Sequence, residues 1–398
     1  MGFRPTKALV PAIVLAVALS ACGAPESPGS SNEPPPQAET PSEPVTLNLL
    51  DAGGVLNFTK PLLEDCRGQN SQLISSINYQ LAPSTETVSK IRAQQAAGQV
   101  TIDLVLAGAD AIGAGVVQNV WLPLLPAYEK NLSGTSGYTE TARQAADVAS
   151  RQAAVVATEF TGPLLMFNPA KVSDPPSTPA ELLEWARDHP KRFTYARPPS
   201  SGPGRDFLMG LPYILGDTDP TNPEAGWSKT WDYLAQLDEH VAPYPSSTGE
   251  SLKGIGQGSY DMIAITAGWD VQARQQNVVP ATTQVAAFDK FTWIVSGHYI
   301  AIPKGIDAER LGASLALINC VLKPDVQAQM FAAQKKSIPA PAVEGVTLAD
   351  APPQVQQEIE KFTRPEYAKL FESAPTASEL EAGKLATALE RWEREIGS

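Results

Sequence analysis

The chain has 398 residues, of which 43% are hydrophobic, and its formal net charge is −13 at pH 7. This length allows two ordinary domains or one large one, and the apolar content is sufficient for substantial cores. The negative charge argues against nucleic acids and anionic surfaces as partners, but leaves small ligands of either sign open.

The N-terminal segment has the pattern of an export signal. Two basic residues and no acid precede an apolar run over 8–19, which is short for a membrane span. The run ends in Leu-Ser-Ala-Cys, which resembles the lipobox of bacterial lipoproteins. We therefore expect removal of residues 1–21 and lipidation of Cys22; an ordinary signal peptide or a single-span anchor is the alternative. Removal would take away two positive charges and so lower the net charge from −13 to −15.

The next segment and the remaining cysteines give two further expectations. Residues 23–44 contain seven prolines, a composition typical of an extended spacer. With Cys22 lipidated, Cys66 and Cys320 are the remaining pair, and an oxidising compartment would permit a disulfide between them. Two buried free thiols are the alternative, because a sequence does not supply the geometry that a disulfide requires.

From residue 45 the chain alternates between strand and helix patterns. Strands are expected at 45–50, 73–79 and 102–107, with helices near 61–67 and 85–97 between them. This order predicts an α/β fold in which helices cover a parallel sheet. In such sheets, ligands bind outside the carboxyl ends of the strands.

The second half continues the alternation. Threonine at 178, proline at 179 and glutamate at 181 predict a helix start. Ser378 and Glu381 predict a capping box for a final amphipathic helix. Further strands are expected at 153–158, 163–167, 193–196 and 260–265.

Three passages resemble ABC-transporter solute-binding proteins of the type II kind, the group of polyamine, thiamine and ferric-ion binders. The passages are 88–98 with 102–105, then 162–169 with 175–183, and finally His298 to Gly305 with 317–319 and 323–327. Residues 193–199 further resemble the YnjB-like branch. The order of these motifs, which covers nearly all of residues 45–398, carries the resemblance.

The resemblance implies a two-lobed α/β fold, each lobe a mainly parallel sheet flanked by helices, with a ligand cleft between the lobes. Residues 45–157 with 288–340 would form the first lobe, which would contain both Cys66 and Cys320. Residues 158–287 with 341–398 would form the second. The implied function is capture of a small solute by lobe closure and its delivery to an ABC permease and its ATPase. The lipid anchor would hold a monomeric receptor, with no cofactor or metal, on the extracytoplasmic face of the cell membrane.

Candidate ligand-binding residues lie in loops at strand ends of both lobes, because lobe closure requires ligand contacts from each. Glycines allow a ligand to approach the backbone closely. An arginine beside a serine-rich helix start suits an anionic group of the ligand. A tryptophan next to an aspartate suits a cationic group. Ordinary turns, solvated loops or core positions are the alternative explanation. The candidates are Asp51, Gly53, Gly54, Asn57, Ala109 and Asp110 in the first lobe, Glu159, Ser201, Gly202, Arg205, Trp269 and Asp270 in the second, and Trp293 and His298 around the returning strand.

The ligand class stays open. Counting back from Pro303, the tryptophan and aspartate of the polyamine binders fall on Ser296 and His298, so the polyamine pattern is not matched. The adjacent tyrosines of ferric binders are also not found at this position. A thiamine-like cation, a polyamine, a phosphorylated compound and a sugar remain candidates. The rival class is an envelope-tethered hydrolase, but the sequence has no HExxH, CxxC, GxSxG or P-loop motif, so a binding protein is expected.

Overall fold

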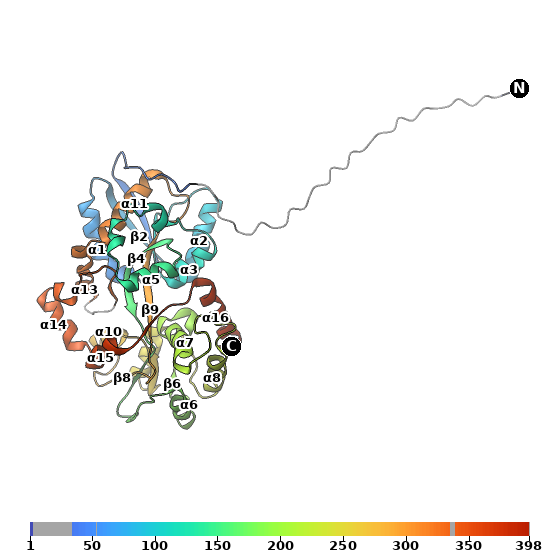
Figure 1. Ribbon diagram of the computed structural model, residues 1–398, viewed down its shortest axis with the longest axis vertical. Coiled ribbons are helices and arrows are strands. Elements are labelled where there is room, and N and C mark those ends of the chain that lie inside the picture. The colour runs from blue at the N-terminus through green and yellow to red at the C-terminus, as the bar shows by residue number, and fades with distance from the viewer. Residues whose placement is uncertain (3–33, 53, 335–338, 398) are drawn as a thin grey trace. The chain divides into compact units, whose positions relative to one another are not determined.

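The structure, a computed structural model, describes residues 1–2, 34–52, 54–334 and 339–397. Cys22, Gly53 and the expected signal peptide lie outside these residues. Residues 36–398 fold as one unit, with two lobes built on separate β-sheets (Figure 1). Within the described part of the chain, no helix combines the length and apolar character needed to cross a membrane.

The first lobe is built on a seven-stranded sheet. Its strands are β1 (Val45–Ala52), β2 (Ile74–Ala82), β3 (Leu104–Gly108), β4 (Ala153–Phe160), β9 (Trp293–Ala301), β10 (Ala340–Pro341) and β11 (Thr376–Ser378). Their order is β10–β4–β9–β3–β1–β2, with β11 paired to β9. β1 is parallel to β2 and β3, as the alternation predicted, whereas β9 runs antiparallel to β3 and β4. The sheet is therefore mixed.

Helices cover this sheet and share one hydrophobic core with it. On the first of them, Phe58, Leu62, Leu63 and Cys66 are buried on one face, the spacing expected of an amphipathic helix. The elements are α1 (Leu56–Gln69), α2 (Ser84–Ala96), α3 (Ala109–Val117), α4 (Leu124–Tyr128), η1 (Ser133–Gly137), α5 (Glu140–Val148), α11 (Ala308–Val321), α12 (Pro324–Gln327) and α13 (Gln329–Gln334).

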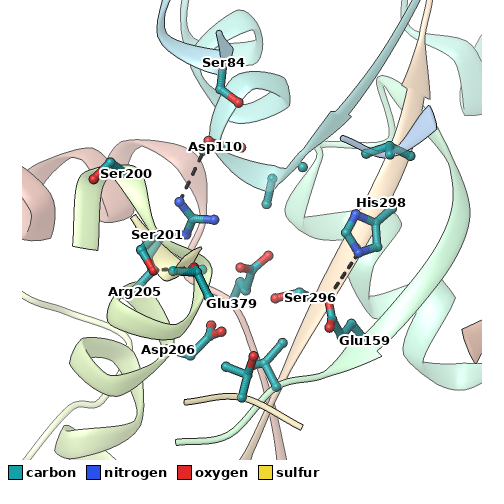
Figure 2. A pocket seen from close by; sticks show the side chains of 18 of the residues that line it. Ser84, Asp110, Glu159, Ser200, Ser201, Arg205, Asp206, Ser296, His298 and Glu379 are labelled. Atoms are coloured by element: carbon teal, nitrogen blue, oxygen red, sulfur yellow. Dashed lines mark hydrogen bonds and ion pairs between the residues drawn. The ribbon is translucent and has the colours of Figure 1, made fainter. Parts of the chain in front are cut away.

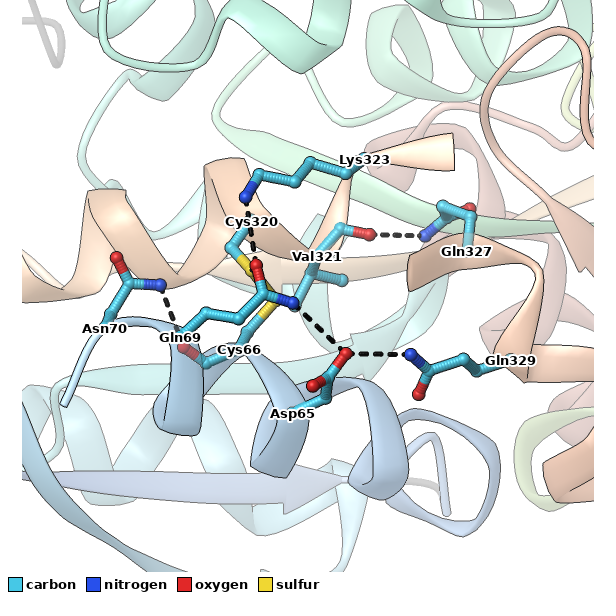
Figure 3. The surroundings of a disulfide bond; sticks show 9 residues. All are labelled: Asp65, Cys66, Gln69, Asn70, Cys320, Val321, Lys323, Gln327 and Gln329. Atoms are coloured by element: carbon cyan, nitrogen blue, oxygen red, sulfur yellow. Dashed lines mark hydrogen bonds between the residues drawn. A yellow bond between two sulfur atoms is a disulfide. The ribbon is translucent and has the colours of Figure 1, made fainter. Parts of the chain in front are cut away.

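A disulfide and two hydrogen bonds attach α1 and the segment before β1 to other helices of the first lobe. A disulfide joins Cys66 of α1 to Cys320 of α11, with 5.7 Å between the Cα atoms (Figure 3). The segment before β1 is also attached, because the Glu39 amide donates to the carbonyl of Ala308 at 3.0 Å and the Tyr128 hydroxyl donates to the carbonyl of Pro36 at 2.7 Å. The expected proline-rich spacer is thus held against the first lobe from Pro36 onward.

The second lobe is built on a four-stranded sheet of β5 (Leu164–Phe167), β6 (Phe193–Thr194), β7 (Met262–Ile265) and β8 (Gln284–Ala286), in the order β6–β7–β5–β8. β6 is parallel to β7, and β5 is antiparallel to β7 and β8. Leu164 and Met166 enter the core on one face of β5, and Leu165 and Phe167 enter the core on the other. Successive side chains of a strand point to opposite faces, so a sheet buried on both faces needs this continuous apolar run.

The helices around the second sheet and in the C-terminal segment complete the fold. They are α6 (Pro179–Asp188), η2 (Pro198–Ser200), α7 (Gly202–Leu215), α8 (Ser228–Asp238), α9 (Thr248–Gly256), α10 (Trp269–Gln275), η3 (Leu348–Asp350), α14 (Pro353–Phe362), α15 (Pro365–Ser373) and α16 (Ala382–Glu395).

The start of the last helix differs from the expectation. α16 begins at Ala382, and its N-cap Glu381 makes no side-chain capping bond. The predicted capping box is wrong because Ser378 is the last residue of β11, where it pairs with Val295 of β9. The pairing with β9 keeps this residue extended, and the residue that follows it enters the site described next.

Candidate ligand-binding site

A cavity of about 430 Å³ lies between the two lobes. Its first-lobe wall includes residues at the carboxyl ends of the three parallel strands: Val55 after β1, Pro83 after β2 and Gly108 at the end of β3. The position agrees with the rule that ligands bind beyond the carboxyl ends of such strands. The volume is in the range of small-molecule sites.

Hydroxyl groups at helix N-termini line part of the cavity. Ser84 and Thr85 begin α2, Thr248 begins α9, and Ser201 is the N-cap of α7. The hydroxyls of Ser201 and Thr248 are hydrogen-bonded at 2.8 Å. Helix N-termini present free N–H groups and hydroxyls, so this wall can bind polar groups of a ligand.

An ion pair bridges the lobes across the cavity. Arg205 of α7 lies with Nη1 3.8 Å from Oδ2 of Asp110 on α3 (Figure 2). The Nε atom of Arg205 is buried and has no hydrogen-bond partner among the described residues. The guanidinium therefore keeps one N–H available for another group.

The strands β4 and β9 bring a second pair to the cavity. Nε2 of His298 lies 3.2 Å from Oε2 of Glu159 (Figure 2). The histidine ring packs edge-on against Phe58. The other nitrogen, Nδ1, and the other oxygen, Glu159 Oε1, are buried without a partner in the described structure. Both residues can therefore form one further hydrogen bond each.

Two more carboxylates, Asp206 and Glu379, complete the polar lining. Burial raises the pKa of Asp206 well above its usual value, the nearby Glu379 raises it further, and Arg205 offsets part of this effect. Burial also raises the pKa of Glu379, which Arg205 and a hydrogen bond from Ser296 partly counteract. Each acid has one buried oxygen, Asp206 Oδ1 and Glu379 Oε2, with no partner in the described part of the chain.

The sequence of this chain matches a known protein family over most of its length. Residues 62–363 match the family of bacterial extracellular solute-binding proteins. The chain belongs to this family. Among curated proteins, the solute-binding chain is similar to protein YnjB of Escherichia coli K12, at 24% identity over 275 residues. That alignment covers 62% of this chain and 66% of YnjB, just under two thirds of the relative's length.

Solved structures share the fold of this solute-binding protein. The periplasmic binding protein AfuA from Actinobacillus pleuropneumoniae, with fructose-6-phosphate bound, superposes with a TM-score of 0.65 at 12% identity, covering 88% of this chain and 98% of AfuA. The substrate-binding protein PotD of a spermidine/putrescine transporter from Streptococcus pneumoniae gives 0.61 at 15% identity, covering 88% and 99%. At these identities the likeness establishes the fold alone, and the predicted two-lobed α/β class is confirmed.

The structure brings seven of the sequence-predicted site residues together around the cavity of the solute-binding protein. They come from both lobes and from the strands between them, as closure on a ligand requires. Ala109, the neighbour of Asp110, is an eighth candidate that lines the cavity. The seven are Asp110, Glu159, Ser201, Gly202, Arg205, Trp269 and His298.

Among the described residues, the candidates at and beyond the end of β1, namely Asp51, Gly54 and Asn57, do not line the cavity. Asp51 is buried and accepts a hydrogen bond from the amide of Leu56, so it holds the turn that leads into α1. Gly54, with φ of +84°, takes the left-handed conformation of that turn, and Asn57 is exposed on α1. Val55 lies at the cavity in their place.

Two further predicted residues are buried away from the cavity. Asp270 accepts hydrogen bonds from Arg364, Arg274 and the hydroxyl of Tyr367, a network that fastens α10 to the segment before and within α15. Trp293 is buried, and its indole N–H donates to the carbonyl of Leu370 at 3.1 Å. The sequence placed this tryptophan and this aspartate near strand ends. That position alone does not distinguish a residue that contacts ligand from one that makes internal contacts.

Several cavity residues were not singled out from the sequence. The strand-end rule could have found Ser84, which follows β2, and the position next to Arg205 could have suggested Asp206. No local pattern indicated Glu379. It reaches the cavity only because β11 pairs with β9, a contact between segments more than 80 residues apart in sequence. The other overlooked residues include Thr161, Thr248, Thr266, Ser296 and Gly297.

Proposed function

We propose that this protein is the solute receptor of an ABC importer. It captures a small polar solute between its lobes and, once closed, delivers it to a membrane permease driven by an ATPase. The observation that carries the proposal is the interlobe cavity, in which buried polar atoms of Glu159, Arg205, Asp206, His298 and Glu379 have no partner among the described residues. Buried polar atoms are almost always hydrogen-bonded, so atoms left free at one cavity indicate a ligand.

The seven predicted residues at the cavity are proposed as ligand contacts. Lobe boundaries at 45–157 with 288–340 and at 158–287 with 341–398 are proposed with them, except that β11, which lies within 341–398, pairs with β9 in the sheet of the first lobe. A lipid on Cys22 would hold the receptor, as a monomer, at the extracytoplasmic face of the membrane. This tether would raise the receptor's effective concentration at the permease.

We propose binding without chemistry. A serine or cysteine hydrolase needs its nucleophile against one ring nitrogen of the histidine base. In the described structure, Nε2 of His298 contacts Glu159, and Nδ1 has no partner. Neither nitrogen is in contact with a nucleophile, so no specific observation favours the enzyme alternative.

The proposal is tested by adding candidate solutes and small-molecule extracts to the purified protein. A true ligand at a hundredfold its dissociation constant should add about 2.7 kcal/mol to the free energy of unfolding. It should also reduce the radius of gyration in small-angle scattering, and mass spectrometry should recover it chemically unchanged. Glu159→Gln should weaken the response, whereas Glu184→Gln, at an exposed glutamate on α6, should keep it. Chemical conversion of the ligand, or no closure with any compound, would contradict the proposal.

A further inference from the structure

The charges around the cavity are unbalanced. Among the residues that the structure describes, four carboxylates line it, from Asp110, Glu159, Asp206 and Glu379, against one guanidinium, that of Arg205. Asp110 already lies beside that guanidinium, at 3.8 Å. Among the described lining residues, the other three carboxylates therefore have no lysine or arginine within ion-pair distance, and one of them, Glu159, lies 3.2 Å from Nε2 of His298.

These three carboxylates are buried and incompletely hydrogen-bonded. Glu159, Asp206 and Glu379 are only 8%, 3% and 6% exposed. Each has one buried oxygen without a partner in the described residues: Oε1, Oδ1 and Oε2, respectively. Because an ionised carboxylate is unstable when it is removed from water without compensation, these oxygens favour a ligand that supplies N–H donors and positive charge.

The three acids also interact with one another. Figure 2 shows their side chains in the lower half of the view, around the same space. Glu379 and Glu159 both raise the pKa of Asp206, after burial, which is the larger cause. Acids that disfavour each other's ionisation are stabilised together by one cation placed among them.

Building on the proposed function, we infer that the solute is a small polar organic amine whose protonated amino group binds to Glu159, Asp206 and Glu379. An ammonium group has only donors, and the free atoms of these three side chains are acceptors. The rest of the molecule faces the hydroxyls of Ser84, Ser201 and Thr248 at the helix N-termini. Those groups suit hydroxyl or carbonyl substituents.

The other solute classes fit this lining less well. A phosphate or sugar phosphate would bring negative charge to the three carboxylates and, among the described lining residues, would meet one guanidinium, that of Arg205, which already lies beside Asp110. A bare metal ion needs converging ligands at about 2 to 2.6 Å. In the part of the chain that the structure describes, no three His, Cys, Asp or Glu side chains are arranged to hold one.

Glu379 reaches the cavity from the C-terminal segment of the chain. It lies beyond residues 62–363, which match the family, and it reaches the cavity through the pairing of β11 with β9. Its amide donates to the carbonyl of Val295 at 3.2 Å, so the backbone fixes the position of its carboxylate. The amine specificity therefore depends on a residue outside the shared family segment.

The test uses amines paired with their hydroxyl counterparts: ethanolamine with ethylene glycol, putrescine with 1,4-butanediol, glucosamine with glucose, and 4-aminobutyrate with 4-hydroxybutyrate. Fructose-6-phosphate is the anionic comparison. In parallel, native mass spectrometry identifies what the wild-type protein retains from a bacterial small-molecule extract. We expect thermal shifts and calorimetric binding for at least one amine and none for its hydroxyl partner, and a retained compound that carries an amino group.

Variants test the role of the carboxylates. Glu379→Gln and Asp206→Asn should each weaken binding of the amine about 30-fold or more, because each removes a charged acceptor from a buried site. Glu381→Gln is the matched control, since this residue is two positions away, exposed and without a capping bond. Melting of the ligand-free variants verifies that they fold.

The outcomes separate the two proposals. If the retained or best-binding compound is an anion or a neutral molecule without an amine, the amine inference is overturned while the receptor function stands. The same holds if Glu379→Gln and Asp206→Asn bind the ligand as tightly as the control variant. If wild-type protein retains nothing and closes on nothing, the receptor function itself fails.

Discussion

Arg205 of α7 and Asp110 of α3 form an ion pair across the cavity, with 3.8 Å between Nη1 and Oδ2. This contact connects the second lobe to the first without a ligand. It therefore influences both the lobe equilibrium and the charge that a solute meets, because it neutralises the single guanidinium that lines the cavity.

The first prediction concerns this ion pair. Asp110→Asn should shift the ligand-free protein toward open lobes, since the pair is only partly buried and is worth about 1 kcal/mol, or roughly fivefold in the open-to-closed ratio. Small-angle scattering of the ligand-free protein should give a larger radius of gyration. Asp188→Asn, an exposed aspartate at the end of α6, is the control. An unchanged radius for Asp110→Asn would show that the pair does not hold the lobes.

The second prediction concerns the stability of the ligand-free protein. The pKa of Asp206 and that of Glu379 are raised in the folded state, so each acid favours folding below its unfolded pKa and loses that contribution as pH rises through its folded pKa. At neutral pH, Asp206→Asn and Glu379→Gln should therefore stabilise the ligand-free protein, by about 1 to 3 kcal/mol. Chemical denaturation at pH 7 measures this. The gain should shrink in acid, and destabilisation at pH 7 would contradict the assignment.

A third prediction is the pH dependence of ligand binding. A cationic solute needs ionised carboxylates, and the raised pKa values mean that Asp206 and Glu379 begin to take up protons above the usual carboxyl range near 4. Affinity for the amine should fall as pH decreases, by up to about tenfold per pH unit for each proton displaced. Calorimetry in buffers of different ionisation enthalpy should detect proton release on binding. Affinity that rises in acid would instead indicate an anionic solute.

The disulfide supports a fourth prediction. Cys66 and Cys320 join helices α1 and α11 of the first lobe across a sequence separation of 254 residues (Figure 3). Replacing both with alanine should lower the free energy of unfolding by about 2 to 5 kcal/mol. A reducing agent should destabilise the wild-type protein similarly and leave the double variant unchanged. Equal stability of the two proteins would show that helix packing alone holds α1 against α11.

The fifth prediction addresses the proposed lipid anchor. Each buried methylene contributes about 0.8 kcal/mol of membrane affinity, so two or more acyl chains on Cys22 would hold the protein at a membrane. The wild-type protein should partition into detergent, and Cys22→Ser should move to the aqueous phase. Intact mass should show the lipid on the wild-type protein only. A mature wild-type protein without added lipid would rule out this anchor.

Local sequence patterns predicted much of the fold because they act over a few residues. Thr178 is the N-cap of α6, as its spacing to Glu181 predicted, and its hydroxyl accepts from the Glu181 amide. The parallel strands β1, β2 and β3 were also expected from the alternation of apolar runs. Their carboxyl ends then placed Asp110 near the site, since parallel strands end at one edge of a sheet.

The sequence by itself determined the α/β class, the family resemblance, an export pattern and a group of polar residues at strand ends. Only the tertiary structure decided which of those residues share one cavity. Asp270 forms an internal ion pair with Arg364. Glu379, which no local sequence pattern indicated, is placed at the cavity by the pairing of β11 with β9. The physical reason is that a buried carboxylate is stabilised by whatever partner lies within a few ångströms, and that partner is set by contacts between distant segments.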